Sequence, residues 1–275
     1  MARSTRARSS GRGSGRPTGR TITYYPPDVP RLDQLLARNL GCSRKEATKL
    51  LRAGLVLDAR GEPIVDGRAE LQPNPAGWLE LEVDGTRVRL RERMHLMQHK
   101  PAGVVTSRKD GMHPTAWALL GDAPLHGELL AIGRLDLDAT GLLLWTTEGA
   151  SVHALTHPKR AIPREYQVAL AREFAEPPRD HEGHIALTLA DDYVPKVDEL
   201  GEIDDAARHV ALPLPSGTSR LARVVLRSGA FHEVKRIFAA LGSEVLALTR
   251  VSHAGLRLPD DLEVGSWREL EELPG

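Results

Sequence analysis

Two segments near the start of the chain carry apolar residues at helical spacing. Residues 32–40 place leucines three and four positions apart and stop at a glycine. In the next segment, Ser43 and Glu46 form a capping-box pattern, an apolar stripe follows, and Gly54 ends the run. The spacing therefore predicts two short consecutive helices.

Short apolar runs follow the helix pair. Runs at 55–57, 64–65 and 78–83 predict strands, and the third leads into an Asp84-Gly85 hairpin turn. Four alternating arginines then mark a charged connector: Arg87, Arg89, Arg91 and Arg93. The chain thus begins with a helix pair and a small sheet, and a larger domain is predicted to begin at about Met94.

The larger domain is rich in predicted strands. These lie at 96–100, 104–105, 141–147, 165–170, 209–214, 221–226 and 245–248. The clearest helix spans 231–241, with Phe231, Val234, Ile237, Phe238 and Leu241 on one face. Because strands and helices do not alternate regularly, the order predicts an α+β fold.

Composition and charge narrow the function classes. Of 275 residues, 41% are hydrophobic and 27% charged, which is ordinary globular composition and excludes collagen-like, coiled-coil or wholly disordered chains. No apolar window is long enough for a membrane span. The 37 basic and 37 acidic residues balance, but six arginines and no acid fall within residues 1–20. Residues 1–29 are therefore predicted to be a disordered basic arm, suited to contact with a polyanion.

A single cysteine limits the chemistry. Cys42 excludes an internal disulfide and any zinc site with several cysteines, and it fits a reducing, cytoplasmic location. His181 and His184 have a spacing seen in metal sites, but no third ligand is evident. We therefore expect no metal.

The outer face of the helix pair is basic. It carries Arg31, Arg38, Arg44, Lys45, Lys49 and Arg52. Such residues either solvate an exposed helix face or bind nucleic acid, and both readings stay open from this segment alone. Residues 30–90 resemble the S4 RNA-binding module, in which a helix pair with a cationic face precedes a small hairpin. The resemblance implies that these six side chains bind RNA.

The most informative stretch is residues 133–149, G-R-L-D-L-D-A-T-G-L-L-L-W-T-T-E-G. A polar, glycine-flanked loop with one arginine and two carboxylates runs directly into an apolar strand, which holds a charged group rigidly at the mouth of that strand. This run resembles the G-R-L-D-x-x-(T/S)-x-G-L-(L/I) signature of the pseudouridine synthases.

Three further segments are similar to motifs of the same family, in the expected order. They are K-P-A-G-V-V at 100–105 with H-P-T at 113–115, R-E-Y at 164–166, and G-A-F-H-E-V-K-R-I-F at 229–238. Together with the first module, they resemble the RsuA/RluB-type ribosomal RNA pseudouridine synthases. The resemblance implies a catalytic domain over 94–272, built on a mixed, mainly antiparallel sheet flanked by helices.

The resemblance also implies roles for particular residues. Asp136 matches the essential aspartate, which attacks the sugar C1′ or the base C6, and Tyr166 matches the aromatic residue that packs on the target base. Lys235 matches the basic partner of the aspartate, and Arg134 orders the loop or contacts phosphate. Further RNA contacts are assigned to Lys100, Arg164, His232 and Arg236.

The implied reaction needs no cofactor and no metal, because it only moves a glycosidic bond from N1 to C5 of uridine. The implied partner is ribosomal RNA or an assembling ribosomal subunit, met by a monomeric enzyme. The motifs favour small-subunit (16S) RNA over large-subunit (23S) RNA.

Two other classes remain as alternatives. Asp136 and Asp138 also fit the D-x-D-x-T loop of haloacid-dehalogenase-type phosphohydrolases, in which both aspartates serve a magnesium-dependent reaction. If the chain is instead a pseudouridine synthase, Asp138 only stabilises the turn. The other alternative is a non-catalytic S4-type RNA-binding or ribosome assembly factor.

Overall fold

The computed structural model of the chain describes residues 31–74 and 78–274. The basic arm predicted at 1–29 lies outside these residues. Within them, no helix has the length and apolarity needed to cross a bilayer.

The first part contains the predicted helix pair and a small sheet. Helices α1 (Leu32–Leu40) and α2 (Arg44–Arg52) precede a three-stranded antiparallel sheet of β1 (Val56–Leu57), β2 (Leu79–Val83) and β3 (Thr86–Leu90). Both hydrogen bonds of the capping box at Ser43 and Glu46 are present. These elements enclose a hydrophobic core of their own, centred on Leu36 and Leu51. The helix pair is therefore confirmed.

Two local predictions in this part are wrong. Residues 64–65 form no strand, because this loop makes only an isolated bridge at Pro63. Arg87 and Arg89 lie on β3, so they belong to the sheet and not to a connector. Their alternation is the period-two pattern of a strand with one face exposed.

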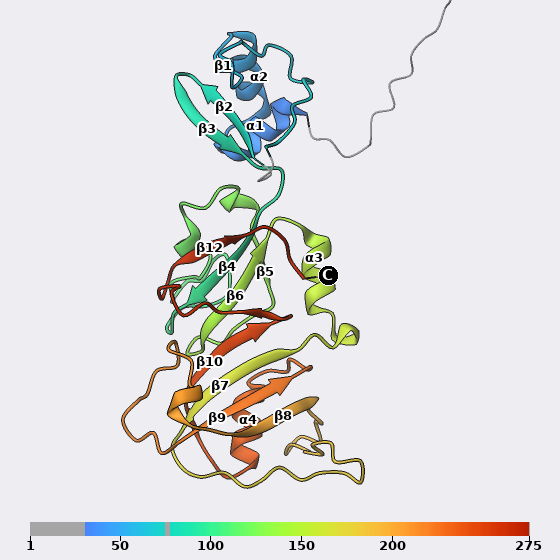
Figure 1. Cartoon of the computed structure of the whole chain (residues 1–275), viewed down its shortest axis with the longest axis vertical. Helices are drawn as coiled ribbons and strands as arrows, with labels where there is room; N and C mark the ends of the chain where they lie inside the picture. The colour runs from blue at the N-terminus through green and yellow to red at the C-terminus, as the bar shows by residue number, and fades with distance from the viewer. Residues whose placement is uncertain (1–30, 75–77, 275) are drawn as a thin grey trace, which may run out of the picture. The chain divides into compact units, whose positions relative to one another are not determined.

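The larger part of the described chain is built on one sheet (Figure 1). Its strands are β4 (His95–Lys100), β5 (Leu130–Ile132), β6 (Thr140–Thr146), β7 (Arg164–Leu170), β8 (Val197–Ile203), β9 (Arg220–Leu226), β10 (Val245–His253), β11 (Leu256–Arg257) and β12 (Trp267–Leu270). The path runs β12-β4-β6-β10-β7-β9-β8, with β5 on β6 and β11 on β10. Among the described residues only β6 and β10 pair in parallel. The α+β fold with a mixed, mainly antiparallel sheet is confirmed.

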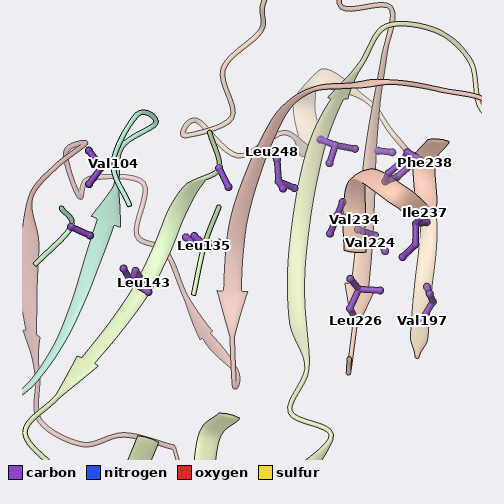
Figure 2. Packing of buried hydrophobic residues seen from close by; sticks show 14 of the residues in the cluster. Val104, Leu135, Leu143, Val197, Val224, Leu226, Val234, Ile237, Phe238 and Leu248 are labelled. Carbon is purple, nitrogen blue, oxygen red and sulfur yellow. The ribbon is translucent and has the colours of Figure 1, made fainter. Parts of the chain in front are cut away.

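Strand β6 is apolar throughout because both of its faces are covered. Leu143 and Trp145 point into the larger core, to which α4 (Glu233–Ala240) contributes its apolar side. Leu142 and Leu144 join a second core that includes residues of α3 (Gly149–Thr156). Figure 2 shows the larger core running from Val104 and Leu143 to the side chains of α4. The central strand is thereby held from both sides.

Outside the central strands, several observed elements differ from those that the sequence predicted. Residues 104–105 make a single bridge to Thr115, and 209–214 form turns where strands were expected. Helix α3 and strands β5, β8, β11 and β12 were not predicted, and the strand predicted at 245–248 covers only the first part of β10. Four short 3₁₀ turns complete the described elements: Ala118–Leu120, His126–Glu128, Pro158–Arg160 and Asp205–Ala207. Most of these elements are short or lie at a sheet edge, where apolar periodicity is weak.

The predicted helix at 231–241 begins later than expected. Helix α4 starts at Glu233, so Phe231 lies in the preceding turn and is 77% exposed. Its assignment to the buried face is wrong. The left-handed backbone of His232, with a φ of 50°, ends the turn and re-aims the chain before the helix starts.

One row across the sheet brings distant motifs together. Lys100 of β4 lies opposite Gly141 of β6, Gly141 opposite Arg250 of β10, and Arg250 opposite Tyr166 of β7. Residues directly opposite on neighbouring strands project from the same face, so Lys100, Arg250 and Tyr166 share one face. Gly141 is required in this row, because a Cβ there would lie 2.3 Å from the carbonyl oxygen of Arg250.

Candidate active site

The loop that carries Asp136 is held by its backbone. The buried ammonium of Lys100 donates hydrogen bonds to the carbonyl oxygens of Asp136 at 3.0 Å and Ala139 at 2.8 Å, and also to Pro101 at 3.0 Å. The loop therefore wraps around a single cation at the end of β4. This contact arises because the register of β4 and β6 places Lys100 opposite the first residues of β6.

Two further contacts hold the same loop from the segment after β4. The Thr106 hydroxyl donates to the Leu135 carbonyl at 3.0 Å and accepts from the Leu135 amide at 3.1 Å. The Gly103 amide donates to the Leu137 carbonyl at 2.8 Å. The Leu135 side chain is buried in the larger core (Figure 2). Backbone and side chain together fix the loop on both sides of Asp136.

Arg250 braces the loop from β10, and the sequence analysis missed it. Its Nε donates to the Leu142 carbonyl at 2.8 Å and its Nη1 to the Arg134 carbonyl at 3.2 Å. Its Nη2 is buried without a hydrogen-bond partner among the described residues. Burial lowers the pKa of Arg250, and the neighbouring Tyr166 opposes this. An arginine inside an apolar strand was the available signal, because a buried charge needs partners.

The Asp136 carboxylate itself stays accessible. Its side chain is 31% exposed, and the His232 imidazole lies beside it, with Nε2 3.9 Å from Oδ2. The Arg134 side chain is exposed and has no ion pair or hydrogen bond within 31–74 and 78–274. The loop thus presents one carboxylate and one unpaired guanidinium while its backbone is immobilised.

Lys235 does not pair with Asp136, contrary to expectation. Its ammonium donates to both oxygens of Asp138, at 2.7 and 2.6 Å. Partial burial alone would raise the pKa of Asp138, but the Lys235 ammonium outweighs this and lowers it. The reason is the late start of α4, which turns His232 toward Asp136 and places Lys235 one turn further, beside Asp138. Asp138 is therefore an ion-pair partner rather than only a turn residue.

The assignment of Lys100 to RNA contact is wrong. Its side chain is completely buried beneath the loop and cannot reach a ligand on the surface. Burial lowers its pKa from 10.5 to about 8, although the Asp138 and Asp136 carboxylates act in the opposite direction. Lys100 is a buried anchor whose charge is sensitive to mildly alkaline pH.

Arg164 and Arg236 are partly buried and have partners within the protein. The Arg164 guanidinium donates to the Ser228 carbonyl at 3.3 Å. Arg236 pairs with Asp191 and lies over the Tyr193 ring, 5.4 Å from its centroid. Both arginines therefore support the turn before α4, and any contact with RNA uses only their remaining exposed surface.

The basic residues of the helix pair divide into two groups. Arg31 and Arg44 share the buried carboxylate of Asp33, and Arg38 pairs with Glu128 at 2.7 Å. The second group is exposed and forms no ion pair in the part of the chain that the structure describes: Lys45, Lys49 and Arg52. Only this second group, all on α2, is free to meet a polyanion with its whole charge.

The two histidines at metal-like spacing lie on one exposed turn. Possible ligand atoms of His184, Asp180 and Glu182 lie within 4.8 Å of one another. The Asp180 carboxylate accepts backbone hydrogen bonds from Glu182 and His184, both at 2.9 Å, and so closes this turn. His181 lies nearest to Glu182, at 3.7 Å. The turn is explained by its own hydrogen bonds.

The Asp136 carboxylate is anchored through the backbone of its loop, and it forms no ion pair with a lysine or arginine within 31–74 and 78–274. An immobilised loop keeps the carboxylate in one orientation, which favours nucleophilic attack on a positioned substrate. The Tyr166 side chain, partly buried against the larger core, shares the sheet row of the two loop anchors. Among the described residues, the site thus combines an accessible carboxylate, an aromatic ring and one exposed guanidinium, that of Arg134.

Comparison with known proteins shows the family to which the chain belongs. A model of the family described as RNA pseudouridylate synthase matches residues 94–240. The chain is 35% identical over 248 residues to "Ribosomal small subunit pseudouridine synthase A" of Vibrio parahaemolyticus, covering 88% of this chain and 96% of the relative. It is 33% identical over 243 residues to an "Uncharacterized RNA pseudouridine synthase" of Aquifex aeolicus, covering 88% and 93%.

A solved structure agrees with these matches. The structure titled "Crystal structure of pseudouridylate synthase" is 30% identical and superposes with a TM-score of 0.52, covering 88% of this chain and 96% of that one. The phosphohydrolase and non-catalytic alternatives are therefore excluded. The anchored Gly133–Ala139 loop lies within the matched family region, and the chain belongs to the RNA pseudouridine synthases, in the RsuA family.

Proposed function

We propose that this enzyme converts a uridine of small-subunit (16S) ribosomal RNA to pseudouridine. The observation that carries this choice is the relative from Vibrio parahaemolyticus, whose name specifies the small subunit and whose length is matched almost completely. The E. coli relative of the same name, at 32% identity, supports it over a similar span.

We further propose that residues 30–90 act as an S4-type RNA-binding domain and 94–272 as the catalytic domain. In support, the first region has its own hydrophobic core, and the larger sheet begins with β4 at His95. The free cations of α2 supply the sequence-independent part of RNA affinity through phosphate contacts.

In the catalytic domain, we assign the nucleophile to Asp136 and the packing of the target base to Tyr166. The supporting observations are the anchored loop and the accessible carboxylate. Attack of the carboxylate on C1′ or C6 forms a covalent bond to the substrate, and the N1–C1′ bond breaks. The base turns, C5 bonds to C1′ and the carboxylate leaves, while C5 loses its proton and N1 gains one. Arg134, with its unpaired guanidinium, is assigned to a phosphate near the target.

Lys235 receives a different role from the one expected. Its ion pair with Asp138 links the first turn of α4 to the end of the loop. We therefore assign Lys235 to positioning the loop and not to direct contact with Asp136. His232, whose imidazole Nε2 lies 3.9 Å from Asp136 Oδ2, is assigned to the RNA-facing side of the site.

The test is a map of pseudouridine in ribosomal RNA from cells with and without the gene, repeated with purified enzyme on 16S and 23S transcripts. We expect one 16S position to lose its modification in the deletion strain and to regain it in vitro. A lost position in 23S RNA would overturn the choice of subunit and leave the enzyme class intact.

A salt titration tests the basic surface of α2. Replacement of Lys45, Lys49 and Arg52 together by glutamine is expected to weaken RNA binding and to make the slope of log affinity against log salt shallower by about 2 to 3, because each phosphate contact contributes about 0.7–0.9. The measurement is filter binding at several KCl concentrations.

The control replaces two charges, those of Arg60 and Arg68, which are exposed basic residues of the same region outside both helices. We expect the control to keep the wild-type slope. An equal change in both variants would mean that the effect reports net charge rather than a binding face on α2.

A further inference from the structure

Phe231 is an exposed aromatic residue beside the active-site loop. It is 77% exposed, although the chain has only three phenylalanines. Its ring stacks on the His232 imidazole, with centroids 3.7 Å apart and planes 20° from parallel. Single exposed hydrophobic residues are common on protein surfaces, so the exposure of Phe231 does not by itself indicate a function.

The turn that carries the pair is locked from within. The buried Glu233 carboxylate accepts hydrogen bonds from the Ser228 hydroxyl at 2.6 Å, the Tyr193 hydroxyl at 2.9 Å and the Ala230 amide at 3.1 Å. His232 holds a left-handed conformation that non-glycine residues seldom adopt. A rare backbone conformation of this kind persists only where surrounding contacts hold it in place, and such conformations are concentrated at functional sites.

The pair lies at the nucleophile. His232 Nε2 is 3.9 Å from Asp136 Oδ2, so the inner ring borders the carboxylate. Phe231 stacks on that ring and keeps most of its own surface open to solvent. The exposed Arg134 side chain adds positive charge on the same loop, whereas the Lys235 ammonium is paired with Asp138. The site therefore presents a flat aromatic surface beside Asp136, with one cation on the same loop.

We propose that the Phe231–His232 stack is a platform for an unpaired nucleobase adjacent to the target uridine. An everted uridine leaves its neighbours without a stacking partner, and aromatic rings replace that partner for any base because every base has a π-face. The preset turn lowers the ordering cost of binding. The inference rests on the RNA activity of the family and not on the choice of ribosomal subunit.

The test compares Phe231→Leu with Phe231→Tyr on 16S and 23S transcripts tritiated at uridine C5, because the reaction releases that hydrogen. For Phe231→Leu we expect kcat/KM to fall about 5- to 100-fold, mainly through a higher KM, since stacking acts before the chemical step. Phe231→Tyr keeps the ring and is expected to stay within twofold of wild type. The control Val264→Ala, at an exposed apolar position elsewhere, is expected to leave KM unchanged.

A spectroscopic measurement separates stacking from bulk. A synthetic RNA hairpin spanning the mapped uridine carries 2-aminopurine on its 5′ or 3′ side, and stacking on Phe231 is expected to quench the probe at one of these positions with wild type and Phe231→Tyr but not with Phe231→Leu. Thermal unfolding confirms that the variants are folded.

Three results would overturn the platform. They are a Phe231→Leu enzyme with wild-type KM, a loss confined to kcat, and equal defects in the leucine and tyrosine variants. A wild-type enzyme that modifies only 23S RNA would contradict the proposed subunit and would still test the platform on that transcript.

Discussion

Replacement of Asp136 by asparagine is expected to reduce pseudouridine formation by about a thousandfold or more. Asparagine keeps the size of the side chain, and the loop is held through backbone carbonyls and amides that the substitution does not touch. What is lost is the anionic carboxylate to which we assign the nucleophilic attack, and an amide does not replace it. Tritium release from transcripts labelled at uridine C5 measures the loss, and filter binding is expected to show RNA affinity within a few-fold of wild type.

Asp138→Asn is the matched comparison, because it alters the second carboxylate of the same loop. It removes the negative charge that binds Lys235 but leaves the Asp136 carboxylate, so we expect a loss of about tenfold or less. If Asp138→Asn proved inactive and Asp136→Asn active, the two carboxylates would have to exchange roles.

The second large effect is expected from Lys100→Met. Methionine fills a similar volume but leaves the carbonyls of Asp136, Ala139 and Pro101 without their shared donor. Unpaired buried acceptors cost about 1–3 kcal/mol each, and relief from burying an ammonium offsets part of this. We expect the free energy of unfolding to fall by about 1–3 kcal/mol and kcat to fall by about a hundredfold, because the loop no longer holds Asp136 in one position.

The pH dependence distinguishes Lys100 from a merely structural residue. Its pKa is about 8 in the folded enzyme and 10.5 in the free side chain. Below about pH 8 the group is charged in both states, whereas between about 8 and 10.5 only the unfolded chain keeps the proton, so this group's contribution to stability rises with pH in that window. Activity is expected to fall above about pH 8, because the loop loses its cation.

A pH–rate profile and denaturant unfolding at several pH values test whether activity falls above about pH 8 while the contribution of Lys100 to stability rises. In Lys100→Met the residual activity is expected to lack the alkaline limb near pH 8. If the variant kept that limb, the titration would belong to another group. If it kept wild-type kcat, the backbone contacts of the ammonium would be irrelevant to catalysis.

Much of the fold followed from local patterns. The leucine spacing and the Ser43–Glu46 capping box predicted α1 and α2, and the apolar runs predicted the long strands β4, β6, β7 and β9. These elements carry strong periodicity or complete burial, which a short window of sequence can report. Edge strands such as β8 and β12 and the short helix α3 carry weaker patterns, and they were missed.

The site divides in a similar way. The motif around Asp136 predicted the class of reaction, because its residues, 133–143, form one continuous segment that can be recognised in the sequence. The buried position of Lys100 was not predictable, since it depends on the register of β4 against β6. Arg250 joins the site only because β10 pairs with both β6 and β7.

By itself, the sequence determined the α+β class, the helix pair and the loop that carries Asp136, because periodicity, capping and a contiguous motif are local properties of the chain. The tertiary structure alone decided that Lys100 and Arg250 anchor this loop, that Lys235 binds Asp138, and that Phe231 faces solvent. These contacts depend on strand order, register and the residue at which α4 begins. Such features are settled by packing between segments far apart in the chain, which no local pattern encodes.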